Sequence, residues 1–455
     1  MLEKIFHLKE HGTTVKTEIL AGLTTFLSMA YILAVNPNIL GTVMNADGVF
    51  LATAITSAVA TVIMGIYANY PIGLSAGMGL NAYFAFTVCM VDLKGVEDPF
   101  RIALTAVLVE GVVFIFLTLF KFREAMINAI PMNLKYAITT GIGLFIALIG
   151  LVGAGIVVSD PSTTIAMGDL RSPSVVLASV GFLIIVILSH YRVKGAVLFG
   201  ILFTWVLGMG AELTGWYQVV PDQQLYSLFP SFTNGFNFSA LGDTAFQFNF
   251  SWAVDHFVQF LAIVFSFLFM DLFDTVGTVV GVADKANLLD KEGKLPKAGR
   301  VFMADAIGTT LGACLGTSTV TSFVESSTGV GAGGRTGLTA CTTGLLFLVS
   351  IFLSPVFVAV PTFATAPALV YVGMLMFSSC KKLDFEKDIA DTVSAYVTII
   401  IMLLTYSIAN GIMYGILSWV ILKVCTGKYR QISPFMLILF LLFVLRVIAL
   451  ITGFM

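Results

Sequence analysis

Three carboxylates occur in stretches of the sequence that are otherwise apolar. Asp271 and Asp274 lie in FSFLFMDLFDTVGT (265–278), and Glu325 lies in GTSTVTSFVESSTGVGAGGRTG (316–337). Asp271 and Asp274 are three residues apart, so on a helix they share one face. A charge at bilayer depth is costly and is by default a sign of a functional site. Burial and a neighbouring negative charge both favour the neutral acid, so these groups could take up and release a proton.

Each carboxylate also has a purely structural interpretation. One of the aspartates could make a helix cap or a packing hydrogen bond, and Glu325 could only complement the positive end of a helix. Function is favoured for Glu325 because the chain around it is rich in Gly, Ser and Thr. We expect residues 316–321 to be extended, followed by a short helix with Ser322 as N-cap and Glu325 in its first turn. A span broken in this way is typical of transporter sites at the membrane midplane.

A second interrupted span surrounds Asn81. In PIGLSAGMGLNAYFAF (71–86), Pro71 and the glycines argue against a helix in the first half. The Asn81 amide could cap this span, or it could offer a donor and an acceptor to a heterocyclic ligand. The first span, about 18–36, carries Ser28 within a polar stripe at helical spacing together with Thr24 and Tyr31.

Composition identifies the chain as a polytopic membrane protein. It has 455 residues, of which 58% are hydrophobic and 11% are charged, and its mean hydropathy is +0.97; soluble domains are less apolar. A net charge of −2 gives no basic footprint for nucleic acid. The five scattered cysteines are interpreted as free thiols. The motifs of hydrolases and ATPases are absent, so we expect no enzyme, no cofactor and no metal site.

The apolar runs predict an all-α protein with about fourteen spans and a cytoplasmic N-terminus. This orientation leaves only Lys94, Arg101 and Arg171 outside, as the positive-inside rule favours. Loop 213–251 is then external and the charged loop 284–300 internal. Whether the apolar stretch 433–452 crosses the membrane, re-enters it or lies on its surface stays open.

The two halves of the chain are weakly similar. IIVILSHYRVKG (184–195) aligns with IIMLLTYSIANG (400–411), and Asn81 falls opposite Glu325. Pro131 and Gly143 also match Pro361 and Gly373 at the same spacing. Seven spans in each half make the second half inverted in the membrane, and inverted repeats with paired broken helices indicate a transporter. The run GVGAGG (329–334) lacks the context of a dinucleotide loop and is better interpreted as a close helix contact.

These motifs resemble the AzgA-type purine permeases of the nucleobase–ascorbate transporter superfamily, which include guanine/hypoxanthine and adenine permeases. The resemblance covers nearly the whole chain. The residues that carry it are EHGTTVKTEILAGLTTFLSMAYILAVNP (10–37), GLNAYFAF (79–86), MDLFDTVGT (270–278) and ESSTGVGAGGRTG (325–337).

The resemblance implies a fold and a site. The fold is a 7+7 inverted repeat with short strands in spans 3 and 10. A core domain (1–120 and 214–354) would hold the substrate against a gate domain (121–213 and 355–455). The substrate-binding residues implied by the resemblance, together with those that we expect to complete the site, are Asp271, Glu325, Asn81, Asp274, Phe323 and Ser28.

The function expected from this resemblance is proton-coupled import of guanine, hypoxanthine or adenine across the plasma membrane. A flat purine with paired N–H donors suits a carboxylate acceptor and an aromatic ring. The expected partners are the purine base, a co-transported proton and membrane lipid, with a homodimer through the gate domains as a possibility. The alternatives are an anion exchanger of the same fold, a sodium-coupled nucleobase transporter, a channel and a membrane enzyme. An anion site needs positive potential, and a channel needs a continuous polar pore.

Overall fold

The computed structural model describes residues 2–120, 130–219, 227–230, 237–286, 288, 295–386 and 388–452. Parts of the predicted external loop 213–251 and internal loop 284–300 lie outside these residues. The helices that position the rest of the chain are α1 (Leu2–Phe6), α2 (Val15–Met29), α3 (Ile32–Leu40), α4 (Ala46–Ile63), α5 (Met78–Ala82), α6 (Pro99–Leu119), α8 (Met132–Gly153), α9 (Pro173–His190), α10 (Ala196–Leu213), α11 (Phe250–Asp255), α12 (Phe257–Lys285), α13 (Ala298–Leu315), α14 (Ser326–Gly331), α15 (Gly337–Ser350), α16 (Ser354–Val358), α17 (Thr362–Phe377), α18 (Ile389–Leu404), α19 (Ile408–Cys425) and α20 (Pro434–Thr452). The strands are β1 (Leu74–Ala76), β2 (Val157–Asp160), β3 (Thr164–Met167) and β4 (Val320–Ser322).

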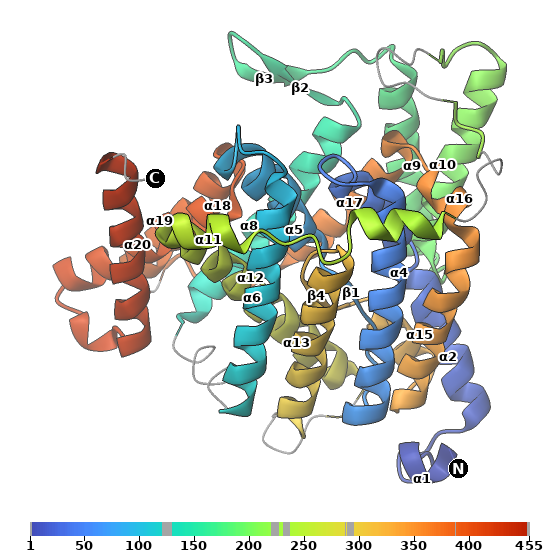
Figure 1. The fold of residues 1–455 in the computed structure, drawn as a ribbon, viewed down its shortest axis with the longest axis horizontal. Coiled ribbons are helices and arrows are strands. Elements are labelled where there is room, and N and C mark those ends of the chain that lie inside the picture. The colour runs from blue at the N-terminus through green and yellow to red at the C-terminus, as the bar shows by residue number, and fades with distance from the viewer. Residues whose placement is uncertain are drawn as a thin grey trace.

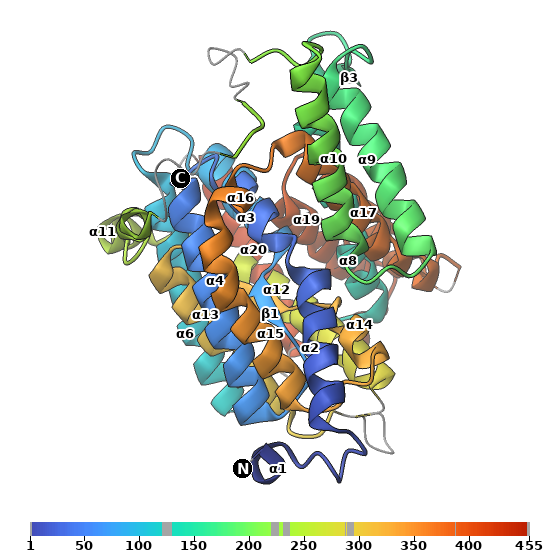
Figure 2. The ribbon, with the colours of Figure 1, turned by 90° about the vertical axis from the view of Figure 1, so that its right-hand side faces the viewer.

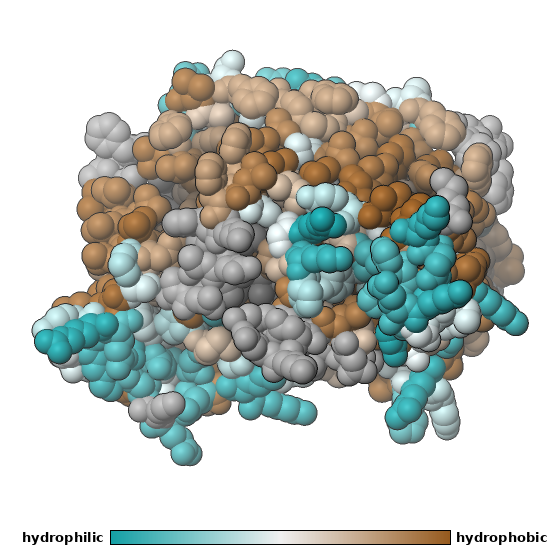
Figure 3. Space-filling model, turned by 90° about the horizontal axis from the view of Figure 1, so that it is seen from below, coloured by the Kyte–Doolittle hydropathy of each residue, from teal (hydrophilic) through white to brown (hydrophobic). Residues whose placement is uncertain are grey.

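The long helices are apolar enough to cross a membrane. Among the described residues, nine helical segments have the required length and composition, and four shorter apolar helices accompany them. The all-α membrane fold is therefore confirmed, whereas the count of about fourteen spans stays a prediction. Seen from the end where α1 lies, hydrophilic side chains gather toward the viewer, with apolar side chains beyond them (Figure 3).

Helix contacts fall into two groups. In one, α15 packs on α2 and α4, while α13 packs on α4 and α6. In the other, α8 packs on α17 and α18, and α9 packs on α10 and α17. Figure 2 shows α9 and α10 on the opposite side of the molecule from α6 and α13.

The two broken spans meet in the middle of the molecule. Strands β1 and β4 pair antiparallel, with Leu74 opposite Ser322 and Ala76 opposite Val320. Both lie among the upright helices at the centre of Figure 1. Backbone hydrogen bonds continue past both ends of the pair, from Gly77 N to Thr319 O and from Phe323 N to Gly73 O, each 3.0 Å long. The predicted short strands in spans 3 and 10 are confirmed.

The predicted N-cap of the short helix is wrong. Ser322 is the last residue of β4, where the pairing with Leu74 holds its backbone extended. The helix begins later, at Ser326, and Glu325 occupies the N-cap position with a helical backbone and without a side-chain cap. Strand pairing therefore overrides the local capping preference of the serine, and Glu325 precedes the first turn.

Repeat-related residues lie in matching places. Pro131 immediately precedes α8, and Pro361 immediately precedes α17. The two helices cross at Gly143 and Gly373, where a Cβ on Gly143 would lie 2.6 Å from the Gly373 carbonyl oxygen. A Cβ on Gly373 would lie 2.4 Å from the Gly143 carbonyl oxygen. The reciprocal contact is what a pseudo-twofold relation between the halves produces, and only glycine allows it.

The glycine-rich run after Glu325 also serves close packing. A Cβ on Gly329 would come within 2.7 Å of the Ala21 carbonyl oxygen on α2 and closer still to Thr25. A Cβ on Gly334, the last residue of the run, would lie 2.9 Å from the Ala21 Cβ. These contacts agree with the helix-contact interpretation of GVGAGG.

Helix α20 contacts α19 and α12, which pack on α18 of one group and on α6 of the other. It packs along α19 and reaches α12 through Phe443, whose ring lies edge-on to Phe265 with the centroids 5.9 Å apart. Met436 and Leu439 are buried on the same side. Nineteen helical residues extend about 28 Å, close to the thickness of a hydrocarbon core. In Figure 1 α20 stands upright like α6, with its chain running in the opposite direction.

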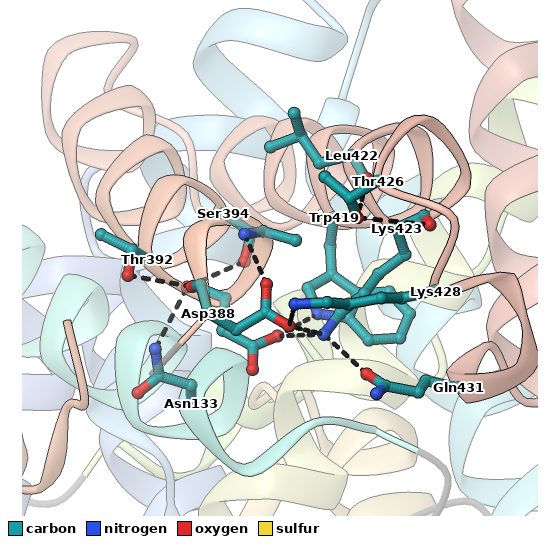
Figure 4. A network of polar contacts seen from close by, with 12 residues as sticks. Asn133, Asp388, Thr392, Ser394, Trp419, Leu422, Lys423, Thr426, Lys428 and Gln431 are labelled. Atoms are coloured by element: carbon teal, nitrogen blue, oxygen red, sulfur yellow. Dashed lines mark hydrogen bonds and ion pairs between the residues drawn. The ribbon is translucent and has the colours of Figure 1, made fainter. Parts of the chain in front are cut away.

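The buried side chain of Lys423 links α18 and α19 to the residues before α20. Lys423, 2% exposed, lies 2.7 Å from Asp388 (Figure 4) and 3.3 Å from Asp391. Its Nζ also donates to Gln431, just before α20, over 2.8 Å. Hydrogen bonds from Lys423 and Lys428 hold the pKa of the Asp388 carboxyl well below its usual range. The start of α18, the end of α19 and the residues before α20 are thereby joined.

A hairpin between α8 and α9 was not expected from the sequence. Strands β2 and β3 pair antiparallel at the top of Figure 1. Asp160 caps the turn by accepting backbone hydrogen bonds from Ser162 and Thr163. These bonds lower the pKa of Asp160.

Another carboxylate, Glu18 on α2, closes the start of α15. It is fully buried, and its Oε1 accepts the Arg335 backbone N–H at 2.9 Å. Its Oε2 accepts the Thr339 hydroxyl at 2.6 Å and the backbone N–H groups of Thr336 and Thr339 at 3.2 Å. The Glu18 side chain of α2 thus accepts hydrogen bonds from backbone N–H groups at the start of α15 that have no partner within their own helix.

We predict that Glu18→Ala strongly destabilises the protein. The substitution leaves several buried N–H groups without acceptors, and each such loss costs about 1–3 kcal/mol. Thermal unfolding of detergent-purified protein is the measurement. The matched control is Glu10→Ala, because the Glu10 side chain is 75% exposed. Equal melting temperatures for the two variants would contradict the capping role.

Candidate substrate site

Two predicted carboxylates lie close to the β1–β4 strand pair. Asp274, half-buried on α12, accepts the Thr321 hydroxyl of β4 over 3.1 Å. Glu325, half-buried before α14, accepts the Tyr31 hydroxyl over 2.6 Å. The two acids are close enough for their charges to interact. Each carboxylate therefore has one neutral hydroxyl donor and unused acceptor capacity.

The predicted asparagine lies on the other broken span. Asn81 of α5 is fully buried, and its Oδ1 accepts the hydroxyl of Ser318, which precedes β4. Its Nδ2 has no hydrogen-bond partner within the described part of the chain. A buried amide donor without a partner is costly, so Nδ2 is suited to donate to a ring nitrogen or carbonyl of a ligand.

The other two predicted site residues are Phe323 and Ser28. Phe323 follows β4 directly, is 5% exposed and belongs to the main hydrophobic core. Ser28 donates to the Thr24 carbonyl over 3.0 Å and accepts the Thr328 hydroxyl over 2.9 Å. The Ser28 hydroxyl is therefore already engaged by protein groups, while Phe323 contributes an aromatic ring at the end of the strand.

Asp271 lies deeper than Asp274. It is fully buried and accepts the Thr275 hydroxyl over 2.9 Å. The same hydroxyl lies 3.1 Å from both carboxylate oxygens of Asp305 on α13. Although three residues apart, Asp271 thus belongs to a polar layer between α12 and α13, whereas Asp274 contacts β4.

Several contributing residues were not singled out as site residues from the sequence. Tyr31 was noted only as part of a polar stripe, and its partner lies 294 residues away. Glu110, fully buried on α6, accepts the Thr319 hydroxyl over 2.7 Å. A lone glutamate in the apolar run 99–119 was the signal that could have identified it. Ser318 and Thr321 could not be told apart from the other hydroxyl residues of 316–322.

The polar groups of the site are carboxylates, hydroxyls and an amide. Among the described residues, no lysine or arginine is hydrogen-bonded or ion-paired to Asp274 or Glu325. Arg335, the nearest arginine in sequence, instead donates to the carbonyls of Val330 and Gly334 at 2.7 Å. No group of three or more potential metal-ligating side chains occurs within the ranges described. This donor and acceptor set suits N–H-bearing ligands and protons better than anions.

Comparisons with known proteins agree with this arrangement. The chain is 41% identical to the adenine permease AdeP of Escherichia coli over 453 residues, which cover 98% of this chain and 96% of that protein. It is 44% identical to the guanine/hypoxanthine permease PbuO of Bacillus subtilis, covering 97% of this chain and 99% of that protein. These relatives confirm the predicted resemblance.

Solved structures share the fold at low sequence identity. The transmembrane domain of the cyanobacterial bicarbonate transporter BicA superposes with a TM-score of 0.64 at 14% identity, over 87% of this chain and 97% of that chain. The SLC26A9 structure gives 0.63 at 11% identity, over 90% and 66%. The model of the permease family matches residues 16–414. With this match and these relatives, the chain belongs to the permease family.

Proposed function

We propose that this protein is a proton-coupled symporter that imports purine nucleobases, guanine and hypoxanthine or adenine, across the plasma membrane. The observation that carries the proposal is the two carboxylates, Asp274 and Glu325, beside the β1–β4 strand pair. The relatives that are named adenine and guanine/hypoxanthine permeases support the substrate class.

The proposed substrate contacts follow from the chemistry of a purine base. Neighbouring ring and exocyclic N–H groups donate to Glu325 or Asp274, each of which retains acceptor capacity. The Asn81 amide donates to a ring nitrogen or carbonyl through its unpartnered Nδ2, and Phe323 packs against the base. Asp271 and Ser28, both bonded within the protein, support these contacts.

The transport step is proposed as a movement of the core domain, 1–120 and 214–354, against the gate domain, 121–213 and 355–455. The grouping of helix contacts supports this division, because α2, α4, α6, α13 and α15 pack on one another while α8, α9, α10, α17 and α18 do the same. The proposed site residues lie within the core domain, on α2, α5 and α12 and between β4 and α14. A homodimer through the gate domains belongs to the same proposal.

Proton coupling is favoured by the charge balance of the site. Two acids without a described cationic partner are expensive to keep ionised in a low-dielectric interior. A proton that binds one of the carboxylates neutralises its charge and takes up no room in the substrate site. Proton binding and release can therefore accompany the binding and release of the substrate. Sodium bound by α12 aspartates and backbone carbonyls is the competing account.

An anion exchanger is the second candidate, since the fold is shared with the BicA transmembrane domain. The acidic site opposes it, because an anion would face Asp274 and Glu325 without a described neutralising cation. Uptake of labelled hypoxanthine, with competition by adenine, guanine, uracil and bicarbonate, decides between these functions. Competition by bicarbonate alone would refute the purine proposal.

We predict different consequences for the two aspartates of α12. Asp274→Asn should raise the KM for purine uptake about tenfold or more, because a charged acceptor at the site becomes an amide. Asp271→Asn should chiefly lower the melting temperature, because it disturbs the buried layer around Thr275. Uptake kinetics and thermal unfolding are measured on both variants. A normal KM in Asp274→Asn contradicts its assignment to the site.

We also predict that a pH gradient alone drives accumulation. Proteoliposomes with an acidic exterior and no sodium should concentrate labelled hypoxanthine above its external level, and a protonophore should abolish this. The sign follows from symport, since protons moving inward carry substrate inward. Accumulation under an inward sodium gradient, but not under a pH gradient, would establish sodium coupling instead.

The proposed orientation gives a third test. On a cysteine-less background, Ser239→Cys in the predicted external loop should react with an impermeant maleimide in intact cells. Lys297→Cys, which is also exposed, should react only after permeabilisation. The reverse labelling pattern would place the N-terminus outside.

A further inference from the structure

The first span and the segment 325–328 are joined by two side-chain hydrogen bonds, one donated from each side. The Tyr31 hydroxyl donates to Glu325 Oε1 over 2.6 Å, and the Thr328 hydroxyl donates to Ser28 over 2.9 Å. Ser28 and Tyr31 are three residues apart in the sequence, and so are Glu325 and Thr328. Close packing of Gly329 against α2 allows this approach. The polar stripe of the first span therefore faces α14.

Tyr31 is well placed to fix the position of Glu325. It is fully buried at the break between α2 and α3, so packing restricts its ring to one position. Glu325 has a longer and more flexible side chain and occupies an N-cap position without a cap hydrogen bond. A short O–H···O⁻ bond is among the stronger hydrogen bonds in proteins. The rigid partner thus determines where the flexible carboxylate points.

The hydrogen bond leaves the carboxylate available to a ligand. Each carboxylate oxygen has two acceptor positions, and Tyr31 uses one position on Oε1. The carboxylate also accepts the Glu325 backbone N–H, and the remaining positions on Oε1 and Oε2 are available to other donors. Two adjacent N–H groups of a heterocyclic base can therefore still bind both oxygens in parallel.

We propose that Tyr31 is a positioning residue for substrate binding, which holds the Glu325 carboxylate in the orientation that accepts the N–H groups of a purine base. This inference rests on the proposed function and adds a residue to it. Tyr31 acts through Glu325 and needs no contact with the substrate. Ser28 and Thr328 form the second contact of the same unit and hold α14 against α2.

The test compares Tyr31→Phe with a matched buried tyrosine. Tyr70 is 5% exposed, and its hydroxyl makes a 2.6 Å hydrogen bond to the Pro296 carbonyl, away from the site. Tyr31→Phe should raise the KM for uptake and the Kd for purine by about tenfold, the effect of one hydrogen bond to a charged group. The kcat and the melting temperature should change little, and Tyr70→Phe should leave KM unchanged.

A double-mutant cycle tests whether Tyr31 acts through Glu325. Equilibrium binding of labelled hypoxanthine is measured for Tyr31→Phe, Glu325→Gln and the combined variant. We expect the tyrosine substitution to have at least threefold less effect in the Glu325→Gln background than alone. Additive effects, an unchanged KM in Tyr31→Phe, or a change confined to the melting temperature would each overturn the proposal.

An infrared measurement separates this inference from the proposed function. The carboxyl band that Glu325→Gln removes from the ligand-free protein should shift in Tyr31→Phe and stay in place in Tyr70→Phe. A wild-type protein that binds no purine base would refute the proposed function, and the band would still report on Tyr31. An unshifted band in Tyr31→Phe would refute the positioning role in a protein that does bind purines.

Discussion

Backbone N–H and C=O groups inside a bilayer must find partners within the protein, because no water is present to replace them. The pairing of β1 with β4 satisfies this requirement at the place where both spans abandon the helix. Additional bonds extend the pair, including one from the Gly73 N–H to the Ser326 hydroxyl. Every candidate site residue lies on these two broken spans or on a helix beside them. The site therefore depends on the strand pair.

Two kinds of carboxylate environment distinguish the site from the rest of the protein. Asp388, the N-cap of α18, and Asp391, in its first turn, are both ion-paired to Lys423, and Asp388 is also paired with Lys428. Asp274 and Glu325 receive hydroxyl hydrogen bonds instead. A hydroxyl orients a carboxylate without cancelling its charge, so the carboxylates remain strong acceptors for a ligand or a proton. The ion-paired acids connect helices, whereas the hydroxyl-bonded acids are suited to binding.

Much of the architecture could be predicted from the sequence because it follows from composition and local interruption. Glycines and Pro71 in one span, and the Ser/Thr-rich run before Glu325 in the other, indicated the two strands that were found. Matching Gly143 and Gly373 indicated the repeat. The sequence could not locate the N-cap of α14, since the pairing partner of Ser322 lies in a distant span. The hairpin β2–β3 was missed because a short polar loop carries little periodic signal.

Within the site, residue types could be predicted better than their partners. Asp274, Glu325 and Asn81 were recognisable as polar groups in apolar spans. Their donors Thr321, Tyr31 and Ser318 were not assigned, because hydroxyl residues are common in these spans and only the three-dimensional pairing selects among them. The separation of Asp271 from Asp274 likewise depends on contacts from α13 and β4, which helical spacing does not contain.

The β1–β4 pair also has a consequence for how the protein is made. Gly73 and Ser326 are 253 residues apart, and ribosomes add about 5–20 residues per second. The first broken span must therefore wait roughly 13–50 s for its strand partner to be synthesised. During that time its extended backbone must be protected by the insertion machinery, by headgroup water or by temporary helix formation. Late assembly of the centre makes this a natural point for membrane quality control to detect a truncated chain.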